Sequence, residues 1–171
     1  MRIVKLFLIS AIVLFATTTF VFILFPSHIR ISRVININSS REKIAAAISD
    51  LKTWEQWNHF ISRSELTHKS ISSPSLGKNA FLVSDQFKVA IIQSMPDTVK
   101  TYWEHGNRGG FEGVFHLVPN HAGNTTVQWY FDFSFKWYPW EKFGSIIYDK
   151  ELGPQMEKSL QNLKQMLEKA P

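Results

Sequence analysis

The fold is decided by residues 125–137, TTVQWYFDFSFKW. Every odd-numbered position carries Thr, Val, Trp or Phe, whereas most even-numbered positions are polar, as at Gln128, Asp132 and Lys136. Successive side chains of a strand point to opposite faces of a sheet. The alternation therefore predicts one long strand over 125–137, with an apolar face that is buried and a polar face in water.

Shorter strands are predicted upstream at 31–38, 79–84, 87–94, 98–105 and 111–118. Turn residues separate them, for example Met95-Pro96-Asp97 and the segment 119–124. The Ser-rich segment 60–78 predicts only one weak strand, at 64–69. Short connections of this kind favour antiparallel pairing.

Helices are predicted on both sides of these strands. Ser39 and Glu42 have the spacing of a capping box, which predicts a helix starting there. A second helical turn over 50–58 would place Trp54 and Trp57 on one face. Another helix is predicted at 140–150, then a kink or break at Gly153-Pro154. A last amphipathic helix is indicated by a stripe of four apolar residues, Met156, Leu160, Leu163 and Leu167.

The order is strand, two short helices, antiparallel strands and a long C-terminal helix that must bury its stripe. This order predicts an α+β fold in which a curved antiparallel sheet wraps around the last helix.

An uncharged apolar run covers residues 6–25 and is long enough, at about 1.5 Å per residue, to cross a bilayer. A cleaved signal is the alternative, but the run is longer than a usual signal core and no small-x-small pair follows it. We therefore expect residues 1–25 to be a transmembrane anchor and residues 26–171 to be one domain. Arg2 and Lys5 precede the run and favour an N-terminus in the cytoplasm, with the domain outside.

Composition excludes several classes. Hydrophobic residues at 44% and charged residues at 19% are not those of a disordered chain. The chain has no cysteine, which excludes disulfides, zinc–thiolate sites, iron–sulfur clusters and cysteine nucleophiles. The net charge of +5 is small and spread out, so no nucleic-acid partner is expected. The sequence contains no metal-binding, nucleophile or phosphate-loop motif. We therefore predict no metal, no cofactor and no catalytic residue. No protein partner is indicated.

Four short motifs carry a family resemblance: WEQW at 54–57, GNTTVQW at 123–129, WYPWEKF at 137–143, and GPQME at 153–157 followed by Leu160 and Leu163. In this order the chain resembles the START-like, or SRPBCC, helix-grip superfamily, close to its polyketide cyclase/dehydrase-type branch, over residues 30–168. The resemblance implies a cavity between sheet and C-terminal helix, used by relatives for lipids, sterols or polyketides. It also implies a bacterial protein, so the expected location is the inner membrane with the domain on the extracytoplasmic side.

The inward apolar residues have two interpretations, a plain core or the wall of a ligand cavity. The candidate ligand-binding residues are Trp103, Phe115, Trp129, Phe131, Phe133, Met156, Leu160 and Leu163. The leading hypothesis is a membrane-tethered binding domain for a hydrophobic small molecule or lipid. The alternatives are an enzyme of the cyclase or hydrolase kind, which needs an inward acid, His or Tyr, and a structural or interaction module with a filled core.

Overall fold

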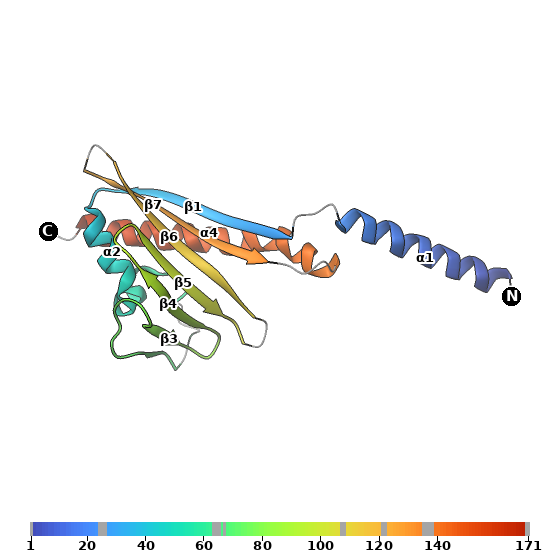
Figure 1. The fold of residues 1–171 in the computed structure, drawn as a ribbon, viewed down its shortest axis with the longest axis horizontal. Coiled ribbons are helices and arrows are strands. Elements are labelled where there is room, and N and C mark those ends of the chain that lie inside the picture. Colours follow the sequence, from blue (N-terminus) through green and yellow to red (C-terminus); the bar gives the residue numbers. More distant parts are fainter. Residues whose placement is uncertain are drawn as a thin grey trace.

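The computed structural model describes residues 2–23, 27–62, 66, 68–106, 109–120, 123–134 and 139–169. Within them one antiparallel sheet has the strand order β1-β7-β6-β5-β4-β3-β2. The strands are β1 (His28–Ile37), β2 (Ser70–Ile71), β3 (Phe81–Val83), β4 (Lys88–Ser94), β5 (Thr98–Glu104), β6 (Gly110–Pro119) and β7 (Thr125–Ser134). The sheet curves around a long C-terminal helix, as the sequence predicts (Figure 1).

The alternation that predicted the last strand is confirmed along β7. Thr125, Val127, Trp129, Phe131 and Phe133 are all buried, and the residues between them are only half-buried. Residues 135–137 of the predicted strand lie outside the described residues. So do residues 64, 65 and 67 of the predicted weak strand, and the strand described nearby, β2, begins at Ser70.

Helix α2 (Arg41–Ser49) begins one residue later than the predicted capping box requires. Ser40 is the N-cap, and its Oγ accepts a hydrogen bond from the Lys43 amide at 3.4 Å. The prediction of Ser39 as the cap was wrong because its carbonyl accepts from the Thr125 hydroxyl at 3.0 Å, which ties Ser39 to β7. The 3₁₀ helix η1 (Leu51–Thr53) and helix α3 (Trp54–Trp57) follow α2.

Helix α4 (Pro139–Lys169) is one continuous helix, so of the kink or break predicted at Gly153-Pro154 the break does not occur. Pro154 removes one backbone N–H, but Met156, Leu160 and Leu163 are fully buried. Burial of this stripe stabilises the helix across the proline, because packing contributes more to helix stability than local propensity does. Helix α4 runs along β1 and packs against α3.

Helix α1 (Arg2–Ile23) extends away from the rest of the chain and carries the N-terminus at its far end (Figure 1). Residues Arg2–Val21 have a mean hydropathy of 2.1 and none of this span is buried. The helix is therefore long and apolar enough to cross a membrane, and a signal sequence has the same properties. The predicted span 6–25 overlaps it up to Ile23, and residues 24–26 lie outside the described part.

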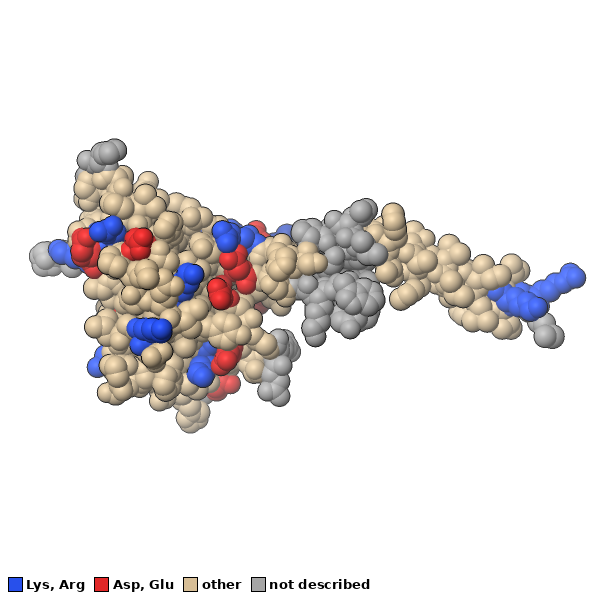
Figure 2. All heavy atoms as spheres, viewed as in Figure 1, with Lys and Arg blue, Asp and Glu red and all other residues tan. Residues whose placement is uncertain are grey.

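One end of the sheet faces α1, and we call it the anchor-facing end. It is formed by the start of β1, the end of β7 and the β5–β6 hairpin, because His28 pairs with Ser134 and Glu104 pairs with Gly110. Helix α4 also begins there (Figure 1). On the domain face drawn in Figure 2, acidic and basic side chains are interspersed.

Candidate functional site

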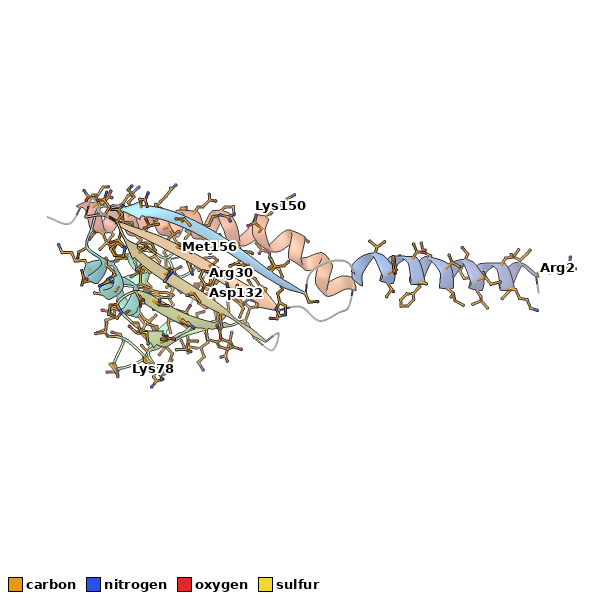
Figure 3. The ribbon with its side chains drawn as sticks, turned by 45° about the horizontal axis from the view of Figure 1, so that its top comes forward. Arg2, Arg30, Lys78, Asp132, Lys150 and Met156 are labelled. Carbon is orange, nitrogen blue, oxygen red and sulfur yellow. The ribbon has the colours of Figure 1, made fainter. Side chains whose placement is uncertain are left out.

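The eight candidate residues come from β5, β6, β7 and α4, and the structure brings them into one buried cluster. None exposes more than 7% of its surface. The five aromatic residues all lie on the sheet, and Met156, Leu160 and Leu163 face them from α4. Figure 3 marks Met156 on α4, behind the sheet. Their role as ligand contacts stays a prediction.

The rings of this cluster pack directly on one another. Trp129 stacks on Phe115 with centroids 4.7 Å apart, and the Phe131 ring meets the Trp129 ring edge-on at 5.1 Å. Trp103 meets Phe131 in the same way at 5.7 Å. Such contacts add to the stabilisation from apolar burial. The interior between sheet and α4 is therefore filled by side chains at this level.

Phe60 packs against this cluster, although no sequence pattern predicted it. Its ring lies 5.8 Å from Trp103, 5.8 Å from Trp129 and 6.0 Å from Phe131. It is only partly buried, and it lies on the turn after α3 rather than on a strand or helix. Because this polar, Ser-rich segment has no apolar periodicity, pattern analysis could not identify Phe60.

Trp54 and Trp57 are fully buried in the same core, with ring centroids 5.4 Å apart. They pack beneath the candidate residues: Trp54 stacks on Trp103 at 5.8 Å, and Trp57 meets Trp129 at 6.4 Å. The other aromatic motif, at 137–143, has no described side chains.

A surface hollow of about 390 Å³ lies at the anchor-facing end of the sheet. His28, Ile29 and Arg30 of β1 line it, together with Asp132 and Phe133 of β7. It was not predicted, because it depends on the register that pairs the start of β1 with the end of β7. A second hollow of about 340 Å³ lies between α3 and the C-terminal part of α4, lined by Gln56, Asn162, Gln165, Met166 and Lys169.

Arg30 and Asp132, which line the first hollow, form an ion pair. Arg30 Nε and Nη2 donate to the two carboxylate oxygens of Asp132 at 2.7 and 2.8 Å, and the guanidinium lies 4.0 Å from the centroid of the Tyr130 ring. This hydrogen-bonded carboxylate raises the pKa of Arg30 above its ordinary value. The two side chains lie on neighbouring strands in Figure 3.

Phe133 is a lining residue of the first hollow and also belongs to the core, where it is only 7% exposed. Its ring stacks on Tyr148 of α4 with centroids 5.0 Å apart, and lies 4.6 Å from Phe111 of β6. Aromatic side chains are in contact from Phe133 through Phe131 to Trp129.

Arg33 connects α4 to the sheet through ion pairs near the anchor-facing end. It donates to Glu157 at 2.6 Å and to Asp149 at 3.0 Å, and its guanidinium covers the backbone at Gly153, where a Cβ would lie 2.0 Å from Nη2. Burial lowers the pKa of Arg33, but the hydrogen bonds to both carboxylates outweigh it and the net shift is upward. Gly153 therefore serves close packing rather than a helix break.

Polar groups inside the cluster are few and neutral. The fully or nearly buried polar residues of the described part are Ser49, Asn58, Thr101, Thr125 and Ser159. No described acid, His, Tyr, Lys or Arg is among them, and no three described His, Asp or Glu residues are placed to hold a metal ion. His105 and His116 lie at opposite ends of β5: His116 contacts Thr98 at 3.3 Å, and His105 follows the last residue of the strand. The described interior therefore suits apolar contact.

Comparison with known proteins agrees with this architecture. Residues 28–168 match the model of a family described as "Polyketide cyclase / dehydrase and lipid transport". Among the curated proteins, none matches the chain. A protein of unknown function from Staphylococcus aureus superposes with a TM-score of 0.65 at 13% identity, covering 82% of this chain and 94% of its own.

Two further solved structures have the same fold. A START superfamily protein from Mycobacterium smegmatis has a TM-score of 0.59 at 19% identity, covering 83% of this chain and 99% of its own. A protein from Rhodobacter sphaeroides has a TM-score of 0.61 at 14% identity, covering 83% and 93%. The family match spans the sheet and most of α4, so this chain, with its START-like α+β fold, belongs to the polyketide cyclase/dehydrase and lipid transport family.

Proposed function

We propose that this protein is a membrane-tethered binding protein for a hydrophobic small molecule or lipid. The observation that carries the proposal is the row of aromatic contacts from Phe133, a residue that lines the hollow at the anchor-facing end, through Phe131 to Trp129. The hollow lies at the first residues of β1, five residues after α1 ends at Ile23. An anchored domain would therefore present this hollow towards the bilayer.

In this mechanism the ligand leaves the bilayer at the hollow and its apolar part exchanges water or lipid contact for contact with Phe, Trp, Met and Leu side chains. Burial contributes roughly 25 cal/mol per Å² of apolar surface before the costs of binding. Phe60 is the side chain best placed to give way, because it is partly exposed and lies on a turn. The other rings in contact with Trp129 are held by strands β6 and β7 and by helix α3.

The proposal places α1 across the membrane, with the N-terminus in the cytoplasm and the domain outside, in the bacterial inner membrane. Alkaline carbonate washing of membranes tests the anchor, because an integral chain stays in the pellet and a cleaved, soluble domain is released. Protease added to intact spheroplasts tests orientation, since a domain on the outer side is digested without lysis.

Ligand binding is tested by purifying the full chain from membranes, exchanging it into detergent and identifying co-purified apolar molecules by mass spectrometry. Met156→Trp adds a ring at a fully buried position on α4 and should displace the ligand. Val34→Trp adds the same ring at a position of β1 that is 60% exposed, so it is the matched control and should retain the ligand. Circular dichroism verifies that both variants fold. A wild-type protein that carries no more apolar material than the Met156→Trp protein would contradict the proposal.

A filled structural or interaction module is the second candidate, and the direct ring contacts around Trp129 favour it. The same experiment separates the two functions. A structural module carries no ligand in any variant, and Met156→Trp then lowers stability without changing what co-purifies.

A further inference from the structure

Trp129 carries a buried hydrogen-bond donor that has no partner. Its side chain is fully buried, and its Nε1 has no hydrogen-bond acceptor among the described residues. The other three tryptophans with described side chains are all paired: Trp54 Nε1 donates to the Ile48 carbonyl at 2.8 Å, Trp57 Nε1 to Thr53 at 3.3 Å, and Trp103 Nε1 to Thr101 at 3.0 Å. Buried polar groups are nearly always paired, so the exception at Trp129 points to an absent acceptor.

A second unpaired donor lies on the turn that carries Phe60. Asn58 is fully buried, its Oδ1 accepts from the Phe60 amide at 3.0 Å, and its Nδ2 has no partner. The Phe60 ring, held on this turn, lies 5.8 Å from the Trp129 ring in an edge-to-face arrangement. Phe60 thus contacts Trp129 through its ring and is hydrogen-bonded to Asn58 through its amide, and each of these two neighbours has an unpaired donor.

The charges around Trp129 select a neutral acceptor. No charged residue of the described part is buried. Arg33 pairs with Trp129 in the β1–β7 register, but its guanidinium is already bonded to Asp149 and Glu157. A carboxylate ligand would therefore be desolvated here without a free cation, which is costly, whereas a carbonyl or hydroxyl oxygen needs only the N–H donors.

We propose that Trp129 Nε1 and Asn58 Nδ2 form a donor site for a neutral oxygen atom of an apolar ligand, a ketone, ester or hydroxyl, which takes the space of the Phe60 ring. This inference rests on the proposed function and specifies its ligand class. The hydrophobic walls provide affinity, and the two donors select ligands that carry an acceptor at one position along the apolar chain. Hydrogen-bonding sites discriminate in this way because a ligand without the acceptor leaves the donors unpaired.

The test uses the full chain in detergent micelles with ¹⁵N-labelled tryptophan. The probes are a medium-chain methyl ketone and the matched alkene in which a methylene group replaces the carbonyl oxygen. Trp129→Phe identifies the indole N–H signal of Trp129 by its loss. We expect the ketone to move this signal downfield and to bind about 5- to 100-fold more tightly than the alkene, the range that corresponds to an unpaired buried donor. A fatty-acid methyl ester distinguishes a lipid ester from a ketone as the source of the oxygen, and preference for either over the alkene supports the proposal.

Variants of the two proposed donors test whether they cause the preference for the ketone over the alkene. Trp129→Phe keeps an aromatic ring but removes the donor, so the preference for the ketone should fall to a few-fold or less, and Asn58→Leu should lower it in part. Trp54→Phe is the control, because its N–H is already bonded to Ile48, and it should keep the preference. Equal binding of ketone and alkene to the wild-type chain overturns the donor site and leaves the proposed function standing. If neither probe binds, the proposed function fails and the donor site fails with it.

Discussion

The hydroxyl of Thr101 joins two strands and one tryptophan, and its removal should measurably destabilise the domain. Thr101 is fully buried on β5, where its Oγ1 donates to the Gly113 carbonyl at 2.9 Å and accepts from Trp103 Nε1 at 3.0 Å. Thr101→Val replaces this hydroxyl by a methyl group of similar size, so packing is retained and both hydrogen bonds are lost.

The expected loss follows from the unpaired groups. A buried donor left without a partner costs about 1–3 kcal/mol, so Thr101→Val should lower the free energy of unfolding by about 2 kcal/mol. For a domain of this size the corresponding fall in Tm is roughly 4–8 °C. Thr101→Ser is the control, because it keeps the hydroxyl and loses only a methyl group, for a cost of about 1 kcal/mol.

The assay is urea unfolding of the full chain in micelles, followed by tryptophan fluorescence, with a double-mutant cycle on Trp103→Phe. In the Trp103→Phe background the indole N–H is gone, so Thr101→Val should cost about 1 kcal/mol less than in the wild type. A Thr101→Val protein within about 0.5 kcal/mol of the wild type, or an equal loss in both backgrounds, would refute this account of the hydroxyl.

Three other perturbations have defined outcomes. Gly113→Ala places a Cβ 2.7 Å from both Phe131 Cε1 and Thr101 Oγ1, so overpacking should lower the unfolding free energy by about 1–3 kcal/mol, seen as a lower urea midpoint. Arg33→Met removes two ion pairs between a side chain that is 23% exposed and two exposed carboxylates, and its cost of about 1 kcal/mol should shrink when the same midpoints are measured in high salt. Ser40→Ala removes the cap of α2 and should cost about 1 kcal/mol, with faster hydrogen exchange at the Lys43 amide; an unchanged rate there would contradict the cap assignment.

Local patterns predicted the sheet well because its signal repeats. The alternation along 125–134 determines which side chains of β7 are buried, and the Leu stripe of α4 determines which face of the helix meets the sheet. Of the kink or break predicted at Gly153-Pro154, the break does not occur for a tertiary reason: Arg33, distant in sequence, lies against Gly153 and holds α4 to β1.

The apolar residues of the candidate site could be predicted from the sequence, but its unpaired polar groups could not. Trp129 has the same residue type and the same burial as Trp54 and Trp57, so nothing in the sequence distinguishes its unpaired N–H from their paired ones. The hollow at His28 and Asp132 depends on strand register, and Phe60 on the path of a turn. These features arise from contacts between segments far apart in the chain.

The interior changes in character along the sheet, and the change explains why binding would begin at the anchor-facing end. Across the β6–β7 ladder, Leu117 pairs with Val127 at the far end, and Phe115 pairs with Trp129 in the middle. Near the anchor, Gly113 pairs with Phe131, and aromatic rings continue to Phe133. Aliphatic side chains interlock, so a ligand that separates them leaves voids, whereas flat rings keep a broad apolar face toward whatever replaces a neighbouring ring.

Gly113 adds to this difference, because the absence of a side chain there gives the Phe131 ring its space. Under the proposed function, an apolar ligand that enters at this end meets rings first, and Phe60 is the partly exposed ring in contact with Trp129. The far end, closed by fully buried Ile37, Ile44 and Ile48, would stay intact and keep the sheet folded. The proposed function would therefore place stability and ligand exchange at opposite ends of the same sheet, with the exchangeable end next to α1.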